Sequence, residues 1–341
     1  MKKILYVLII CAFFANWLPA ETNYEDASNQ FEALAEKVNE FLPKLKALGN
    51  EYPNNVEIQL GIAKLYETPG ARTDPNMVIE YDNIAQYDKI LAIEPDNRPA
   101  LAQKTWLICN RFVVNRNGML EYLESVINAA KEHGMKQLTI PDWGDELYQY
   151  LGKKEQRSVV FDDFDTPVEL LKEKIDKEIP SVIAVIENGQ SKDPNNALYN
   201  YLRAYLLFNL GDTDMAVSEV ETAIKKPYWN NYIVEAKNAE LKVLQEVGFP
   251  EAEKNTVRDT YSPSSIFLSG KIWRKGLEPL GDFYKKEGNL DKARKMYNLA
   301  IGIAKHIKEE PVQYEYHAEN NQKTGENIEN KAQQYIKDIN K

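Results

Sequence analysis

Two stretches of this 341-residue chain place small and large apolar residues at the same intervals, and this spacing is the strongest constraint on its fold. The members of the later stretch are Leu280, Gly281, Tyr284, Gly288, Ala293, Tyr297 and Ala300. Small residues at Gly281 and Ala293 let two antiparallel helices cross closely, and the aromatic rings fill the space around the crossing. Gly288 allows the chain to turn with a positive φ. The spacing therefore predicts a tight helical hairpin.

The earlier stretch keeps these intervals with weaker residues. Its members are Ala204, Leu207, Gly211, Ala216, Val220 and Ala223. Gly211-Asp212 and Gly288-Asn289 form matching turns. The pattern resembles the tetratricopeptide repeat family, which carries a Leu-Gly pair, an aromatic residue, a turn, an alanine and a second aromatic residue in about 34 residues. Pro194 lies where this family would place the closing proline of a preceding repeat.

A third unit near the N-terminus is looser. Ala63 and Tyr66 fit its first helix, and residues 87–97 fit the end of its second helix, including the closing Pro95. Asn83 replaces the small alanine, and the loop from Thr68 to Asp74 is longer than the family's turn. We also expect helices over residues 99–111 and 119–131, whose pairing matches the family poorly, and a degraded unit over 168–189.

The resemblance implies an all-α fold, with antiparallel helix pairs stacked into a right-handed superhelix or solenoid. Helical apolar spacing dominates the chain, and the only strand candidate is Ser158–Phe161. Thr166 is predicted to cap a helix that begins with Pro167. We expect a signal peptide over 1–20, an N-terminal helical region over 21–135, an irregular joint over 136–165 and a C-terminal helical region over 166–341.

The first residues have the pattern of an export signal. Lys2 and Lys3 precede an apolar run from Ile4 to Leu18, and Ala20 is the expected cleavage position. Two alternatives stay open. The leader could be retained as an uncleaved anchor, or Cys11 could carry a lipid. The pattern predicts a bacterial protein that is exported to the periplasm or beyond the cell.

Composition excludes some classes of function. The chain has 42 basic and 52 acidic residues, a net charge of -10, which disfavours nucleic acid as a partner. Cys109 lies in an apolar helical run and is expected to be a buried small side chain. The three histidines lack metal-ligand spacing, and the cluster Asp162, Asp163 and Asp165 is expected to be a solvated loop. We predict no enzyme activity, cofactor or metal.

The resemblance implies that the first helix of each pair lines a concave face that binds peptide or protein segments. On that basis the candidate binding residues are Trp106, Asn110, Tyr201, Tyr205, Asn209 and Lys285. Aromatic rings would cover a ligand's side chains, and amides would bond its backbone. The predicted function is an interaction scaffold. The alternatives are a small-ligand or glycan binder, associated with a transporter, and an enzyme on a helical frame.

Overall fold

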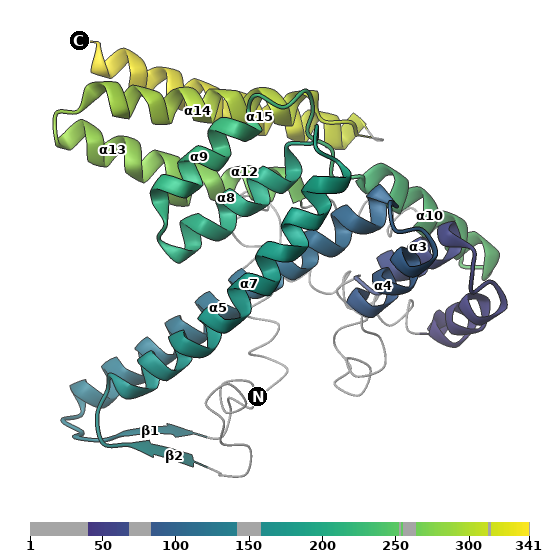
Figure 1. Cartoon of the computed structure of the whole chain (residues 1–341), viewed down its shortest axis with the longest axis horizontal. Coiled ribbons are helices and arrows are strands. Elements are labelled where there is room, and N and C mark those ends of the chain that lie inside the picture. Colours follow the sequence, from purple (N-terminus) through teal and green to yellow (C-terminus); the bar gives the residue numbers. More distant parts are fainter. Residues whose placement is uncertain are drawn as a thin grey trace. The chain divides into compact units, whose positions relative to one another are not determined.

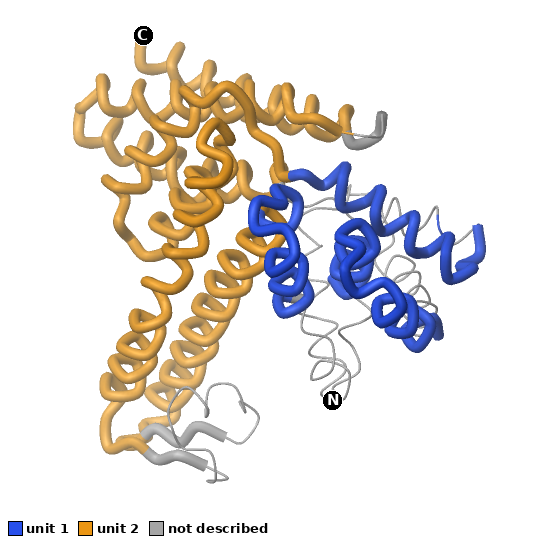
Figure 2. Tube along the Cα trace, turned by 45° about the vertical axis from the view of Figure 1, so that its right-hand side comes forward, with its two compact units in different colours: residues 1–101, 232–262 blue, residues 102–231, 263–341 orange. Residues whose placement is uncertain are grey.

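The computed structural model describes residues 40–67, 83–141, 158–251, 254, 264–312 and 315–340. These residues fall into two compact units, coloured separately in Figure 2. Unit 1 comprises residues 1–101 and 232–262, and unit 2 comprises residues 102–231 and 263–341. The chain therefore passes between the units three times. The sequence predicted ranges of 21–135, 136–165 and 166–341. Their boundaries differ from those of the two units, and these ranges stay a prediction.

Unit 1 is built on α3 (Val56–Leu65), α4 (Asn83–Ile93) and α10 (Ile233–Glu246). Its apolar core comprises Leu42, Leu45, Ile58, Ile62, Leu65, Tyr66, Val243, Leu244, Val247 and Phe249. Gly61 lets helix α3 lie very close to α10, since a Cβ at this position would overlap the backbone of Ala239. The helices expected for the third repeat are thus present, whereas its loop from Thr68 to Asp74 lies outside the described residues.

Unit 2 contains α7 (Thr166–Lys192) and all of α5 (Arg98–Glu132) except its first turn, residues 98–101, which belongs to unit 1; the two long helices lie side by side (Figure 1). The prediction of separate helices over 99–111 and 119–131 is wrong, because α5 is continuous. Arg116 Nη1 and Asn117 Nδ2 each donate a 2.9 Å hydrogen bond to Asn209. These tertiary bonds hold a stretch of low helix propensity in the helix despite Gly118.

A small antiparallel sheet joins the far ends of these helices (Figure 1). It pairs β1 (Leu138–Pro141) with β2 (Ser158–Phe161), in a register that sets Leu138 opposite Phe161. The prediction of a short strand at Ser158–Phe161 is confirmed. The sheet is a local addition, and the helical remainder confirms the predicted all-α class of stacked helix pairs.

The start of α7 differs from the prediction. Thr166 is the first helical residue, and its side chain makes no cap. Instead the carboxylate of Asp163 accepts hydrogen bonds from the Thr166 hydroxyl (2.8 Å) and from the N–H groups of Thr166 and Asp165. These bonds, led by that from the Thr166 backbone, lower the pKa of Asp163. The acidic residue supplies the cap because its two oxygens serve several donors at once.

The rest of unit 2 is a series of helices. They are α8 (Leu198–Leu210), α9 (Thr213–Ala223), α12 (Ser264–Ile272), the π-helical turn η2 (Trp273–Leu277), α13 (Glu278–Lys286), α14 (Leu290–Glu309) and α15 (Glu315–Ile339). Within the described ranges, no helix is both long and apolar enough to cross a membrane. The predicted leader over 1–20, including Cys11, lies outside these ranges.

Candidate functional site

The two helix pairs of unit 2, α8–α9 and α13–α14, share one turn geometry. Gly211 has φ 85° and Gly288 has φ 74°. In the first turn, the N–H of Asp212 donates to the carbonyl of Leu207 at 3.0 Å; in the second, Asn289 donates to Tyr284 at 2.8 Å. The side chains of Asp212 and Asn289 then cap α9 and α14 with identical 3.2 Å bonds. The predicted equivalence of these turns is confirmed.

The helix crossings of the two pairs are also equivalent. The small residues Ala204, Ala216, Ala293 and Ala300 are fully buried, as are the larger partners Val220 and Tyr297. Gly281 faces the ring of Tyr297, and a Cβ there would come within 2.5 Å of the ring. The ring's hydroxyl donates to Asp282 at 2.8 Å. Tyr284 lies beside this crossing with Lys292 Nζ 5.1 Å from its ring centre. The packing residues therefore lie where the spacing predicts them.

The structure places the three aromatic candidates in the interior of unit 2. Trp106 and Tyr205, 4% and 3% exposed, both meet the ring of Phe267 edge-on, at 5.8 and 6.3 Å between centroids. Tyr201 packs against Trp229, and its hydroxyl lies 2.9 Å from Nδ1 of His306. Packing therefore occupies these three rings, and they do not form an open aromatic face.

The three polar candidates lie elsewhere. Asn209 is half-buried and joins α8 to α5 through the bonds from Arg116 and Asn117. Asn110 is also half-buried, and its Oδ1 has no hydrogen-bond partner within the described residues. Lys285 is exposed on α13. The six candidates are thus not brought together into one site, and a binding role for each stays a prediction.

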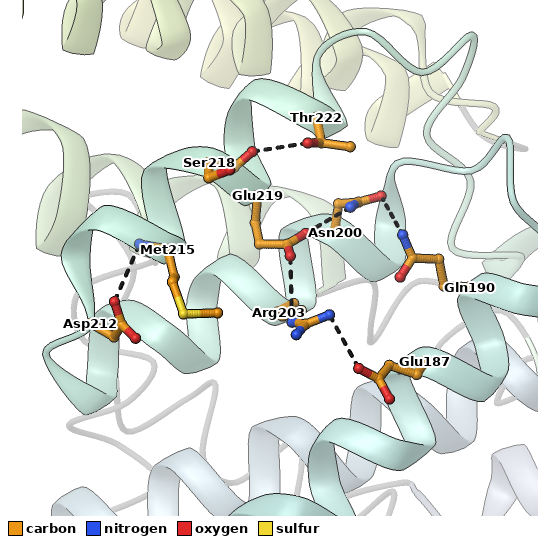
Figure 3. Close-up of polar contacts among 9 residues, drawn as sticks. All are labelled: Glu187, Gln190, Asn200, Arg203, Asp212, Met215, Ser218, Glu219 and Thr222. Atoms are coloured by element: carbon orange, nitrogen blue, oxygen red, sulfur yellow. Dashed lines mark hydrogen bonds and ion pairs between the residues drawn. The ribbon is translucent and has the colours of Figure 1, made fainter.

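A polar network that the sequence did not indicate joins α7, α8 and α9 (Figure 3). Arg203 forms ion pairs with Glu187 at 3.3 Å and with Glu219 at 3.4 Å. Asn200 Nδ2 donates to Glu219 at 2.7 Å, and Gln190 donates to Asn200 at 3.4 Å. Arg203 is 22% exposed and Glu187 is 54% exposed. The network links the three helices α7, α8 and α9 beside the first pair. Its only signal in the sequence was an arginine next to the packing position Ala204.

The second pair also carries exposed side chains on α13 and at its turn. Phe283 on α13 is 54% exposed, and its ring lies 5.5 Å from that of Tyr284. Lys285 and Lys286 follow it on the same helix and are exposed. Leu290, across the turn, is 40% exposed. We call this set, Phe283, Lys285, Lys286 and Leu290, the α13 surface.

Among the described residues, no group of three or more His, Cys, Asp or Glu side chains is placed to hold a metal ion. Cys109 is fully buried, and burial raises the pKa of its thiol to about 12, so its expected role as a packing residue is confirmed.

Comparison with known families agrees with the geometry of the helix pairs. Residues 197–225 and 280–306 match the family described as Tetratricopeptide repeat. These ranges contain α8–α9 and most of α13–α14, so the two helix pairs are tetratricopeptide repeats. No curated protein is significantly similar to the chain. Tetratricopeptide repeats generally mediate protein–protein interactions and generally belong to non-catalytic scaffolds, which supports a scaffold role.

Proposed function

We propose that this chain is a non-enzymatic scaffold, exported to the bacterial periplasm or cell envelope, that binds a protein or peptide segment. The observation that carries the proposal is the pair of tetratricopeptide repeats, with equivalent turns and crossings. Such helix pairs present a fixed surface from which side chains project, and they need no chemistry of their own. The partner is a protein segment rather than nucleic acid, because the chain has a net charge of -10.

The α13 surface is the part of the repeats that best suits a partner. Phe283 and Leu290 offer exposed apolar side chains, and Lys285 and Lys286 add exposed positive charge on α13. Aromatic residues beside cationic ones are typical of the residues that dominate binding energy in protein interfaces. The α8 face is less suitable, since Tyr201 and Tyr205 are buried. We therefore place the binding role on Lys285 and its neighbours in α13.

The ligand-binding alternative receives less support. It needs an open groove lined by aromatic rings, and the rings of Trp106 and Tyr205 are occupied by Phe267. Burial of these side chains is explained by the stability that a packed aromatic cluster gives to unit 2. The interaction scaffold is therefore the function we propose.

The test is affinity capture from a native envelope extract with the full chain as bait, followed by mass spectrometry. A specific partner should be retained by wild type and lost with Phe283→Ala or Lys285→Glu. Two matched controls are Met215→Ala, which removes another exposed apolar side chain, and Lys323→Glu, which reverses another exposed lysine. Partners that are captured equally by all five baits would contradict a binding role of the α13 surface.

Export is tested separately. The full chain is expressed in a bacterial host, cells are fractionated, and the N-terminus of the product is sequenced. The proposal expects the product in the periplasm, beginning at Glu21. A cytoplasmic product that begins at Met1 would refute export, and a membrane-bound product that begins at Met1 would identify the leader as an anchor.

A further inference from the structure

A buried carboxyl group lies at the end of α14. Glu310 is 5% exposed, and its Oε2 accepts a 3.2 Å hydrogen bond from Asn321 of α15. The Ser265 side chain of α12 and the backbone N–H of Asn231 also donate to this carboxyl group. Within the described residues its Oε1 has no hydrogen-bond partner. Four segments of unit 2 therefore meet at one buried carboxyl group.

Two of these segments lie beside points at which the chain passes between the units. Asn231 is the last residue of unit 2 before the chain enters unit 1, and Ser265 follows the point at which the chain returns to unit 2. Gln103 lies just after the point, between residues 101 and 102, at which the chain first enters unit 2. Its side chain donates a 2.6 Å hydrogen bond to the carbonyl of Asn231. These three residues are buried. Glu310 and Gln103 thus hold the chain on the unit 2 side of all three crossings.

The groups that contact Glu310 are neutral. They come from α12, α15 and the segment before α10, and each supplies a hydroxyl, an amide or a backbone N–H. One turn earlier on α14, His306 contacts the Tyr201 hydroxyl and the backbone of Lys226. Burial lowers the pKa of His306. The histidine therefore has other partners and gains no charge from its buried position.

Several charged side chains on α14 and α15 form ion pairs with one another: Lys305 with Glu309 on α14, Lys308 with Glu329 between α14 and α15, and Lys323 with Glu319 on α15. On α12, burial lowers the pKa of Lys271. Burial dominates and raises the pKa of Glu310 to about 7, while its hydrogen bonds act in the opposite direction.

We propose that Glu310 is a pH-responsive latch, which in its neutral form holds the chain tightly where it leaves and re-enters unit 2, and which loosens when the carboxyl loses its proton. A negative charge at this buried position is poorly solvated. Opening the segments around Asn231 and Ser265 exposes the charge to water. The raised pKa in the closed state means that the stabilisation is complete below the ordinary pKa of 4.5 and is lost as pH rises through about 7.

The test is hydrogen–deuterium exchange of the full chain at several pH values, with rates corrected for intrinsic exchange. In wild type, protection factors of peptides covering residues 226–232, 264–270 and 308–312 should fall about tenfold between pH 6 and pH 8. Glu310→Gln keeps a neutral side chain of similar shape, so its protection should not change over this range. The neighbouring, exposed Glu309→Gln is the matched control and should behave as wild type.

Ser265→Ala provides a second test of the proposal if Glu310→Gln fails to fold. It removes a donor that lowers the pKa of Glu310, so the loss of protection should shift to higher pH. A wild-type protein with equal protection at pH 6 and pH 8 would overturn the proposal. The same conclusion follows if Glu310→Gln retains the response, or if Ser265→Ala leaves its midpoint unchanged.

Discussion

The two tetratricopeptide repeats share their turns and crossings but differ in what covers them. Ala204 corresponds to Gly281, and on the flanking positions of the first helix Tyr201, Tyr205 and Phe208 correspond to Glu278, Asp282 and Lys285. The α8 face is apolar and covered, since Tyr201 and Tyr205 are buried. The α13 face is charged, with Lys285 exposed. A helix pair with an equivalent turn can therefore present either a buried or an exposed first-helix face, depending on the residues that flank the crossing.

The crossings differ by a compensating change in size. The first repeat combines Ala204 with Val220, and the second combines Gly281 with Tyr297. The large ring in the second pair leaves no room for a Cβ at Gly281. The two pairs of this chain thus divide the volume at the crossing differently, which is consistent with dense packing at both.

The largest expected effect tests whether the α8 face is covered. Tyr205→Ala should lower the free energy of unfolding by about 3–5 kcal/mol, because it empties a buried site against Phe267. Lys285→Ala, on the exposed face of α13, should change it by about 0.5 kcal/mol or less. Chemical denaturation followed by circular dichroism measures both. Equal, small losses for the two variants would show that the α8 face is not part of the core.

The next effect tests the exchange of volume at the crossings. Gly281→Ala should cost about 1–3 kcal/mol, since the added methyl group meets the Tyr297 ring. Combined with Tyr297→Val, which recreates the residues of the first repeat, the cost of the alanine should fall by at least about 0.5 kcal/mol. The double-mutant cycle is read from denaturation midpoints. Strict additivity of the two substitutions would contradict the proposed compensation.

A smaller effect tests the equivalence of the turns. Asp212→Ala and Asn289→Ala each remove a side-chain cap, and each should cost about 1 kcal/mol. Asp212→Asn and Asn289→Asp keep an acceptor and serve as matched controls, with smaller losses. Thermal unfolding at one fixed pH measures all four. A loss at one turn but not at the other would break the equivalence of the two repeats.

The sequence predicted the repeat packing well because its causes are local. A positive φ at Gly288 and a close crossing at Gly281 each restrict the residue type at a known interval. The role of the aromatic candidates was harder to predict. A ring beside a packing position looks the same whether it faces a groove or a distant helix, and the partner of Trp106 and Tyr205 is Phe267, far along the chain. Tyr205 stands where the second repeat has Asp282. This difference between corresponding positions is the signal that distinguishes a buried first-helix face from an exposed one.

The polar network around Arg203 was missed for a related reason. Its partners Glu187, Asn200 and Glu219 come from three helices, and only their arrangement in space brings them together (Figure 3). The cap at Asp163 was missed because a hydroxyl at Thr166 fits the usual pattern equally well. In both cases the residue types were evident in the sequence, whereas the choice of partner depended on the fold.

The smallest expected effect concerns this network, which the second repeat lacks: Leu280 stands where the first repeat has Arg203, and Met296 where it has Glu219. Glu187→Gln should cost no more than about 0.5 kcal/mol, since Glu187 is 54% exposed and its charge is well screened by solvent. Glu219→Gln should cost more, up to about 1 kcal/mol, because Glu219 is 18% exposed and also accepts from Asn200. Denaturation at low and high salt separates the two, since only the ion-pair part weakens with salt. If Glu187→Gln proved the more costly, the network's main role would be to hold α7 against α8 rather than to join α8 and α9 within the repeat.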